Sequence, residues 1–288
     1  MPKIIATVGV TGITRDPSKP STKKWGDQGV ELVAGRLDDK DSLLRAFQGA
    51  NVIFGFTDFW HYLPDPNNHK GKAIVDAVAA NVATLDRLVL STCSDARKWS
   101  NGDNKWVLHF DAKAEAVKYL ESTYPELWAK TSLLQLGYYV TNWRSFVATP
   151  KKLEDGSFKV SIPVDGDRKI HMVNPAADAG SFVKALVELL AGRHLVGAGS
   201  YISFNEWCDT FSKVNGRRCV FERMADRNYE ELMGPVVGLE LEDMFKYFDK
   251  YGYDGVDPSV LYPRDLRIGI KYTTVRDFMK REDWTSIM

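Results

Sequence analysis

The sequence has few cysteines, no long apolar run and no excess of either charge. Its 288 residues include three cysteines, Cys93, Cys208 and Cys219, with no CxxC spacing. Three thiols cannot build a disulfide framework, so we expect a reducing compartment, cytoplasmic or nuclear. No apolar run reaches the roughly 18 residues that a membrane-spanning helix needs, and no signal-peptide pattern precedes the first strand. We therefore expect a soluble protein that makes no membrane contact.

The charge balance and the histidines exclude two further classes of site. Lys plus Arg number 38 and Asp plus Glu number 38, so there is no overall footprint for nucleic acid or an anionic surface. The five histidines are scattered, without the His-x-x-His or Glu-x-x-His spacing of metal ligands. We expect no metal site and no direct nucleic-acid binding.

Predicted strands and helices alternate through the first half of the chain. The predicted strands cover residues 30–34, 51–57, 86–92 and 131–136, and the predicted helices cover 42–47, 68–83 and 110–122. Alternation at this spacing is typical of βαβ units, and it predicts an α/β fold with a Rossmann-type, mostly parallel sheet flanked by helices. The strands near residues 52–56 and 88–90 lack polar alternation, as expected for strands covered on both faces.

The pattern changes near residue 150. Short strands and turns such as Asp155-Gly156 and Asp165-Gly166 follow, and then several helices. We expect a dinucleotide-binding core over residues 1–149 and a smaller C-terminal α/β lobe over 150–288 that packs on the core.

The first fifteen residues resemble the beginning of a dinucleotide-binding fold from which the segment after the glycine-rich turn is missing. Residues 3–8 are a β-branched run, and Gly9-Val10-Thr11-Gly12 follows at once, which predicts a strand that ends in a glycine-rich turn. A helix should then begin beneath the pyrophosphate. Residues 13–19 instead resemble the end of a second strand and a ribose-reading loop. Neighbouring parallel strands need a crossover of about a dozen residues. We therefore expect residues 3–8 to keep the central position, the second strand to be lost, and residues 30–34 to move inward or leave a defect.

These features and others along the chain together resemble the NmrA-like family of atypical short-chain dehydrogenase/reductases. No single piece is specific, but their order and spacing are. The pieces are the Pro-Lys-Ile-Ile start with Gly9-x-Thr11-Gly12, Thr14-Arg15-Asp16-Pro17, Gly29-Val30-Glu31-Leu32-Val33, Leu37-Asp38-Asp39, Val52-Ile53-Phe54 with Thr57-Asp58-Phe59-Trp60, Leu90-Ser91-Thr92, His109-Phe110-Asp111-Ala112-Lys113-Ala114-Glu115, and Met244-Phe245-Lys246-Tyr247-Phe248 through Gly252-Tyr253. Family members carry a full Gly-x-x-Gly-x-x-Gly, a helix and a second strand at the front. Roughly twenty residues of this crossover are absent here.

The resemblance implies a nicotinamide cofactor, with NADP(H) favoured over NAD(H). By resemblance, Gly9, Thr11 and Gly12 would contact the phosphates, and Arg15 and Lys19 the adenosine ribose and its 2′-phosphate. The remaining implied contacts are Asp38 at the adenine, Thr57, Asp58 and Phe59 beside the cofactor, and Lys113 at the nicotinamide ribose, with Tyr139 and Asn142 nearby. Each has an ordinary alternative. Arg15 could be an exposed loop arginine, and Asp38-Asp39 could cap a helix.

Lys113 and His109 are the candidate catalytic residues. Typical members of the superfamily place Tyr four residues before this Lys, so that the ammonium lowers the phenol pKa. Here the Tyr position is His109, which can transfer protons near neutral pH or can be structural. Weaker candidates are Ser91 and Thr92 at the end of a strand, and His171 and Asn174 in the second lobe. We expect Cys93 to be a core or strand-end residue.

Two functions follow from the resemblance and stay open. One is an NADP(H)-dependent oxidoreductase of small-molecule, secondary-type metabolism. The other is a non-catalytic NAD(P) redox-state sensor or transcriptional co-regulator that acts on a protein partner. A third possibility is a truncated form with impaired cofactor binding. We expect a monomer or homodimer.

Overall fold

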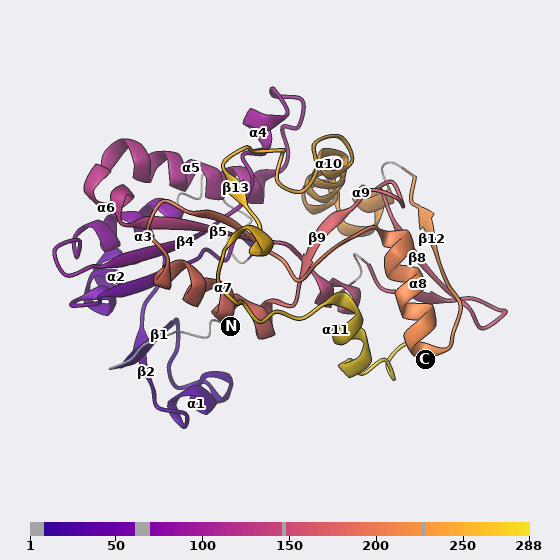
Figure 1. Ribbon diagram of the computed structural model, residues 1–288, viewed down its shortest axis with the longest axis horizontal. Helices are drawn as coiled ribbons and strands as arrows, with labels where there is room; N and C mark the ends of the chain where they lie inside the picture. The colour runs from indigo at the N-terminus through magenta and orange to yellow at the C-terminus, as the bar shows by residue number, and fades with distance from the viewer. Residues whose placement is uncertain (1–8, 61–69, 146–147, 226–227) are drawn as a thin grey trace. The chain divides into compact units, whose positions relative to one another are not determined.

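The computed structural model describes residues 9–60, 70–145, 148–225 and 228–288. The chain forms two compact units that interleave along the sequence. The first contains residues 1–93, 109–135 and 179–195, and the second contains 94–108, 136–178 and 196–288. Within the described residues, no helix is both long enough and apolar enough to cross a membrane. Figure 1 follows the path of the chain.

The sheet of the first unit is parallel where β3, β4 and β5 meet. These strands span Val52–Gly55, Arg87–Thr92 and Thr131–Leu136, and they lie side by side in Figure 1. β3 pairs with β4 and β4 pairs with β5, both parallel. β10 (His194–Gly197) adjoins β5, so the order is β10-β5-β4-β3. The carboxyl ends of β3 and β4 lie at the same edge, which is where ligands bind in open parallel sheets.

Among the described residues, five helices flank this sheet, and the first four of them share one hydrophobic core with it. They are α2 (Lys40–Phe47), α3 (Lys70–Ala79), α5 (Leu108–Thr123), α6 (Pro125–Ala129) and α7 (Pro175–Glu188). The core joins Leu43 of α2, Val75 of α3 and Leu88 of β4, each at most 2% exposed. The predicted α/β fold with a mostly parallel sheet flanked by helices is confirmed. Its strands follow the β-branched runs closely.

The front of the chain differs from the prediction. β1 spans Val10–Thr14, so the segment predicted to be a glycine-rich turn is largely a strand. It pairs in parallel with β2 (Val30–Ala34), and Gly12 lies opposite Leu32. α1 (Pro20–Gly26) lies between the two strands and gives the connection the length that a parallel pair requires. Residues 13 and 14, interpreted from the sequence as the end of a second strand, lie in β1, so the expected loss of that strand is wrong. The predicted strand over residues 3–8 lies outside the described residues.

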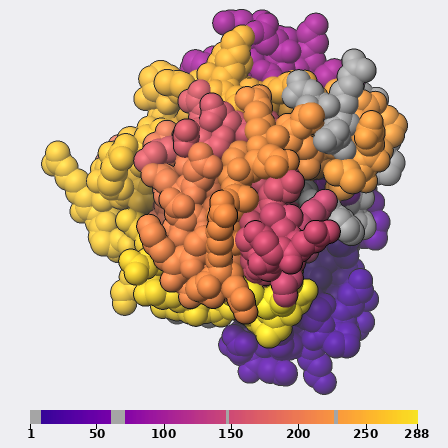
Figure 2. All heavy atoms as spheres, turned by 90° about the vertical axis from the view of Figure 1, so that its right-hand side faces the viewer, coloured from indigo at the N-terminus to yellow at the C-terminus, as the bar shows by residue number. Residues whose placement is uncertain are grey.

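The second unit consists of shorter strands and helices. Its strands are β6 (Tyr138–Tyr139), β7 (Lys151–Lys152), β8 (Phe158–Ile162), β9 (Ile170–Val173), β11 (Ser200–Ile202), β12 (Cys219–Arg223) and β13 (Val260–Leu261). Its helices are α4 (Ala96–Trp99), η2 (Val140–Arg144), α8 (Phe204–Asn215), α9 (Asn228–Met233), α10 (Pro235–Tyr251), η3 (Pro263–Asp265) and α11 (Val275–Arg281). Two three-stranded sheets have the orders β11-β9-β6 and β12-β8-β7. Figure 2 shows the face on which α8 and β12 lie, in orange.

The segment that leads into α5 is fastened to α10. Asp243 of α10 accepts hydrogen bonds from the Asn104 side-chain amide (2.8 Å) and from the Trp106 backbone N–H (2.7 Å). The amide also donates to the Asp243 carbonyl, at 3.0 Å. These contacts fix the chain just before α5 begins at Leu108.

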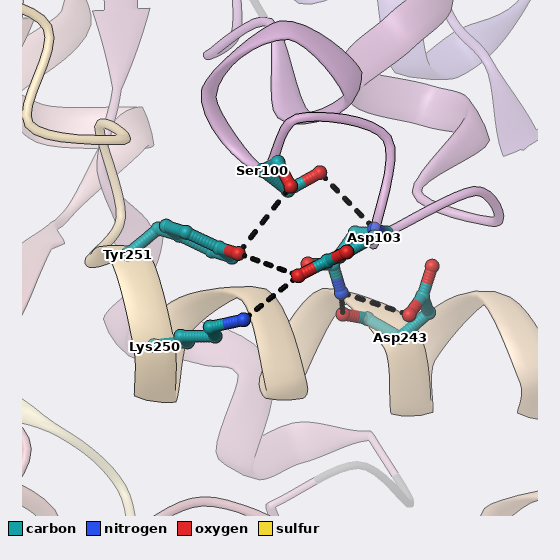
Figure 3. Close-up of polar contacts among 6 residues, drawn as sticks. Ser100, Asp103, Asp243, Lys250 and Tyr251 are labelled. Atoms are coloured by element: carbon teal, nitrogen blue, oxygen red, sulfur yellow. Dashed lines mark hydrogen bonds and ion pairs between the residues drawn. The ribbon is translucent and has the colours of Figure 1, made fainter.

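A second group of contacts fastens the same segment about two turns later on α10. Asp103 accepts from the Lys250 ammonium at 2.7 Å and from the Tyr251 hydroxyl at 3.0 Å (Figure 3). Tyr251 also donates to the Ser100 carbonyl. We call the contacts of Asp243, Lys250 and Tyr251 with residues 100–106 the α10 clamp. Tyr247 and Phe248 of the same helix belong to the C-terminal sequence pattern of the family, and both side chains are fully buried. This part of the pattern therefore reflects packing of the core.

Candidate functional site

Lys113 of α5 lies at the carboxyl end of β3. Its ammonium nitrogen Nζ donates to the Thr57 hydroxyl at 3.1 Å. Burial lowers the pKa of Lys113, and the nearby Cys93 and Asp58 raise it by less. A desolvated ammonium held by a neutral hydroxyl is poised to donate to a polar ligand or to lose its proton.

Asp58, the carboxylate that raises the pKa of Lys113, also faces another cation. The Asp58 carboxylate lies 4.0 Å from the Arg15 guanidinium, and both side chains are about half exposed. Among the described residues, no carboxylate lies within 4.0 Å of the Lys113 ammonium. Four predicted contacts, Arg15, Thr57, Asp58 and Lys113, therefore gather at one edge of the first unit.

Three rings form an aromatic wall beside this site. The Phe59, Trp60 and His109 rings have centroids 5.3 to 5.9 Å apart. Trp60 is 46% exposed, so the wall keeps a surface on which a planar group could rest. His109 precedes Lys113 by one helical turn, which places both on the same side of α5.

Gly71 of α3 sets how closely α3 approaches α5 under this site. A Cβ at residue 71 would lie 2.6 Å from the Ala116 Cβ and 3.8 Å from the Thr57 methyl. The contact requires glycine, because real Cβ atoms do not approach one another so closely. A glycine within a helical pattern was the available signal, and the sequence reasoning gave it no role.

The predicted phosphate contacts lie in strand β1. A Cβ at Gly12 would lie 3.1 Å from Val30 Cγ1 and 3.3 Å from Leu32 Cδ2, so side chains of β2 fill that space. The Thr11 hydroxyl donates to Glu31 at 3.1 Å. Gly9 is exposed and has no neighbouring atom within 4 Å of a Cβ placed on it. The next helix, α1, begins only at Pro20, after Lys19. The residues therefore do not form a glycine turn directly before a helix.

Asp38 and Asp39 have local roles. The Asp39 carboxylate accepts from the Ser42 backbone N–H and caps α2. Asp38 pairs with Arg36 through two hydrogen bonds of 2.9 and 2.8 Å. Asp39 is therefore a helix cap, and the contact of Asp38 with adenine stays a prediction.

Four candidates belong to the second unit. Tyr139 ends β6 and is 43% exposed, and Asn142 lies in η2. His171 is stacked between Tyr201 and Tyr262, with ring centroids at 4.3 and 4.8 Å. The Asn174 carbonyl accepts from the first turn of α7. These positions give His171 and Asn174 packing and capping contacts, and their approach to a substrate stays a prediction.

The remaining candidates lie at the end of β4. Thr92 is buried and its hydroxyl donates to the Cys93 carbonyl at 3.2 Å, whereas Ser91 and Cys93 are partly buried. Cys208 and Cys219 are buried in the second unit, where their mutual contact raises the pKa of the Cys208 thiol. Within the described residues, no group of three or more His, Cys, Asp or Glu side chains could hold a metal ion.

The chain is similar to proteins of known type along most of its length. The oxidoreductase ptmS of Penicillium ochrochloron, which carries an NmrA-like family domain, is 25% identical over 232 residues that cover 74% of this chain and 67% of ptmS. The similar oxidoreductase FrzB of a Cladobotryum species is 24% identical over 235 residues, covering 74% and 68%.

Two solved structures share the fold. The negative transcriptional regulator NmrA in complex with NAD superposes with a TM-score of 0.73 at 18% identity, covering 93% of this chain and 86% of that one. The NADPH-dependent quinone oxidoreductase QOR2 of Escherichia coli, complexed with NADPH, superposes with a TM-score of 0.69 at 18% identity, covering 96% and 91%. The NmrA-like family pattern matches residues 5–279. The chain therefore belongs to the NmrA-like family.

Proposed function

We propose that the protein is an oxidoreductase that uses NADP(H) on a small carbonyl substrate at the Lys113 edge of the first unit. The observation that carries the proposal is the hydrogen bond between Lys113 and Thr57, beside an exposed aromatic wall. Family membership and the oxidoreductase names of the fungal relatives support it.

The residues fit one end of the cofactor better than the other. Lys113 and Thr57 offer donors for a ribose, and the half-exposed Arg15 offers a planar donor for a 2′-phosphate. The pyrophosphate end fits less well, because Gly12 is packed against β2 and no helix starts directly after β1. We therefore expect weak binding, with a preference for NADP(H) that depends on Arg15.

The chemistry of the chain's own residues follows from their positions. A bound nicotinamide would supply or accept the hydride. Lys113 would hold the ribose and place positive charge near the reacting oxygen. His109, one turn away, would give or take the proton in place of the usual tyrosine. Phe59 and Trp60 would orient a planar substrate.

A binding titration tests the proposal first. We expect NADPH to raise the melting temperature more than NADH does, and Arg15→Ala to remove the difference between them. Lys113→Ala should lower NADPH oxidation with a panel of small carbonyl compounds at least a hundredfold, whereas Lys118→Ala, on the same helix, should not. Absence of stabilisation by any nicotinamide nucleotide would reject the proposal and leave the truncated form with impaired binding.

A redox-state sensor is the second candidate. The replacement of the usual tyrosine by His109 favours it, and the fold similarity to a transcriptional regulator is compatible with it. Different melting temperatures with NADPH and NADP⁺, but no turnover of any carbonyl compound, would select the sensor. A protein partner, a cytoplasmic or nuclear location, and a monomeric or homodimeric state belong to this proposal as predictions.

A further inference from the structure

The Lys113 amine differs from an ordinary surface lysine in its surroundings. Its hydrogen-bond partner is the neutral Thr57 hydroxyl at 3.1 Å, and burial outweighs the neighbouring Asp58 in setting its pKa, which is lowered. Asp58 is itself drawn toward Arg15. A lysine that loses its proton more easily than its neighbours is the usual amine nucleophile of proteins.

We propose that Lys113 is a site of covalent modification, at which its amine condenses reversibly with an aromatic aldehyde to form an imine. The proposal uses the same edge of the first unit as the proposed function, but it requires no cofactor and no redox step.

The reaction balances without any further reactant. The amine nitrogen attacks the carbonyl carbon, a C–N bond forms, and a proton passes from nitrogen to the former carbonyl oxygen. The carbinolamine then loses water, so the C–O bond breaks and both N–H hydrogens leave with the oxygen. The Thr57 hydroxyl, 3.1 Å from Nζ, can both donate and accept and is placed to relay the proton.

The aromatic wall determines which aldehydes are favoured. Trp60 is 46% exposed and contacts His109 at 5.3 Å between ring centroids, so it offers a ring surface near the start of α5. Stacking of a second ring on such a surface stabilises the complex beyond the burial of its apolar area. An aldehyde with an aromatic body should therefore react faster here than a short aliphatic one.

Lys118 provides a matched control on the same helix. Its ammonium pairs with Glu115 at 3.0 Å, and both side chains are at least half exposed. It lies on the same helix, five residues after Lys113.

The test labels the whole protein with benzaldehyde and sodium cyanoborohydride, which reduces each imine to a stable benzylamine. Peptide mass spectrometry follows the mark on each lysine with time. At pH 7 we expect Lys113 to be labelled faster than Lys118, because a lowered pKa leaves a larger fraction of the Lys113 amine unprotonated. The ratio should fall toward one at pH 10.5. Equal rates at pH 7 would overturn the proposal.

Three variants separate the proposed reaction at Lys113 from a general loss of structure. Trp60→Ala should slow labelling of Lys113 by benzaldehyde but leave labelling by acetaldehyde unchanged. Arg15→Ala should release Asp58 toward Lys113, raise the pKa of the amine and slow labelling at pH 7 severalfold. Lys113→Arg should lose the mark at residue 113 and keep that on Lys118. Fast labelling of Lys113 in Arg15→Ala would contradict the assigned cause.

Nucleotide binding is measured separately, by thermal shift. Selective labelling of Lys113 in a protein that binds no NADPH would support the modification site and reject the proposed function. Slower labelling on addition of NADPH, with binding observed, would support both.

Discussion

Lys113 and Lys250 are the same side chain in opposite surroundings. Lys113 is partly buried against a neutral hydroxyl, and burial lowers its pKa. Lys250 is 63% exposed, and its hydrogen bonds with Asp103 and Tyr251 raise its pKa. The first arrangement weakens the protonated form and makes the amine available to a ligand. The second strengthens the protonated form and uses it to fasten a loop. The two lysines differ because Asp103 pairs with Lys250 itself, whereas Asp58, the carboxylate near Lys113, pairs with Arg15.

His171 resembles Lys113 in this respect. Asp254 lies near its imidazole, but that carboxylate already accepts from the Tyr262 hydroxyl and from the Val256 backbone N–H. Burial, together with the nearby Arg264, outweighs Asp254 and lowers the pKa of His171 to about 4. In each unit, burial lowers the pKa of a basic side chain, and the neighbouring carboxylate interacts with another donor.

The largest expected effect is a pH dependence at His171. The folded-state pKa of about 4 lies below the unfolded value of 6.5, so the unfolded chain binds more protons between these values. The contribution to stability is complete above pH 6.5 and is lost as the pH falls toward 4. Its full size is about 3 kcal/mol by the usual linkage relation. Urea denaturation at pH 7.5 and 4.5 measures it.

His171→Phe is the control for this prediction. It keeps a ring between Tyr201 and Tyr262 but cannot titrate, so the difference between the two pH values should shrink by about 2 kcal/mol or more. The same pH dependence in the variant would assign the effect to carboxylates elsewhere.

A smaller effect is expected from the α10 clamp. Asp243→Ala removes the acceptors of the Asn104 amide and the Trp106 N–H, and it should lower the free energy of unfolding by about 2 kcal/mol. Asp243→Asn keeps one acceptor oxygen and should lose about half as much. Chemical denaturation of the two variants checks the order. Equal stability of the wild type and Asp243→Ala would mean that the segment before α5 is held by other contacts.

The smallest expected effects are changes in melting temperature when Lys113 or Lys250 is replaced. Lys113→Met removes a desolvated charge and should raise the melting temperature at pH 8. The gain should vanish near pH 10.5, because stability of the wild type rises with pH between the lowered pKa and the unfolded one. Lys250→Met should lower the melting temperature slightly, and less so at high salt. Scanning calorimetry at both pH values measures the pair, and shifts of the same sign would refute the comparison.

The sequence predicts secondary-structure elements well, but it predicts contacts between residues far apart in the chain poorly. Runs such as residues 30–34 and 131–136 have the composition of buried strands, and both are strands within a residue of the prediction. Gly12 was misread because glycine after a β-branched run indicates a turn, whereas in the structure it pairs with Leu32 of β2 and lies against the Val30 and Leu32 side chains. Tertiary packing overrode the local signal.

The site was predicted in part. Thr57 and Lys113 are 56 residues apart, and only the family resemblance placed both near a cofactor. The pair of Arg15 with Asp58 joins segments that follow strands of two different sheets and was not predictable from spacing. His109 was identified as a substitution for tyrosine, but its contacts with Trp60 and Phe59 depend on the folded start of α5.

The contact at Gly71 makes the geometry of the site depend on a single missing methyl group. α3 touches α5 at Ala116, and the Thr57 methyl lies against the same point. Any side chain there would push the helix that bears Lys113 away from the strand end that bears Thr57. The distance between the Lys113 amine and the Thr57 hydroxyl thus depends on how closely the backbone of α3 packs against α5. Evolution or design could retune this site by changing a residue that takes no part in its chemistry.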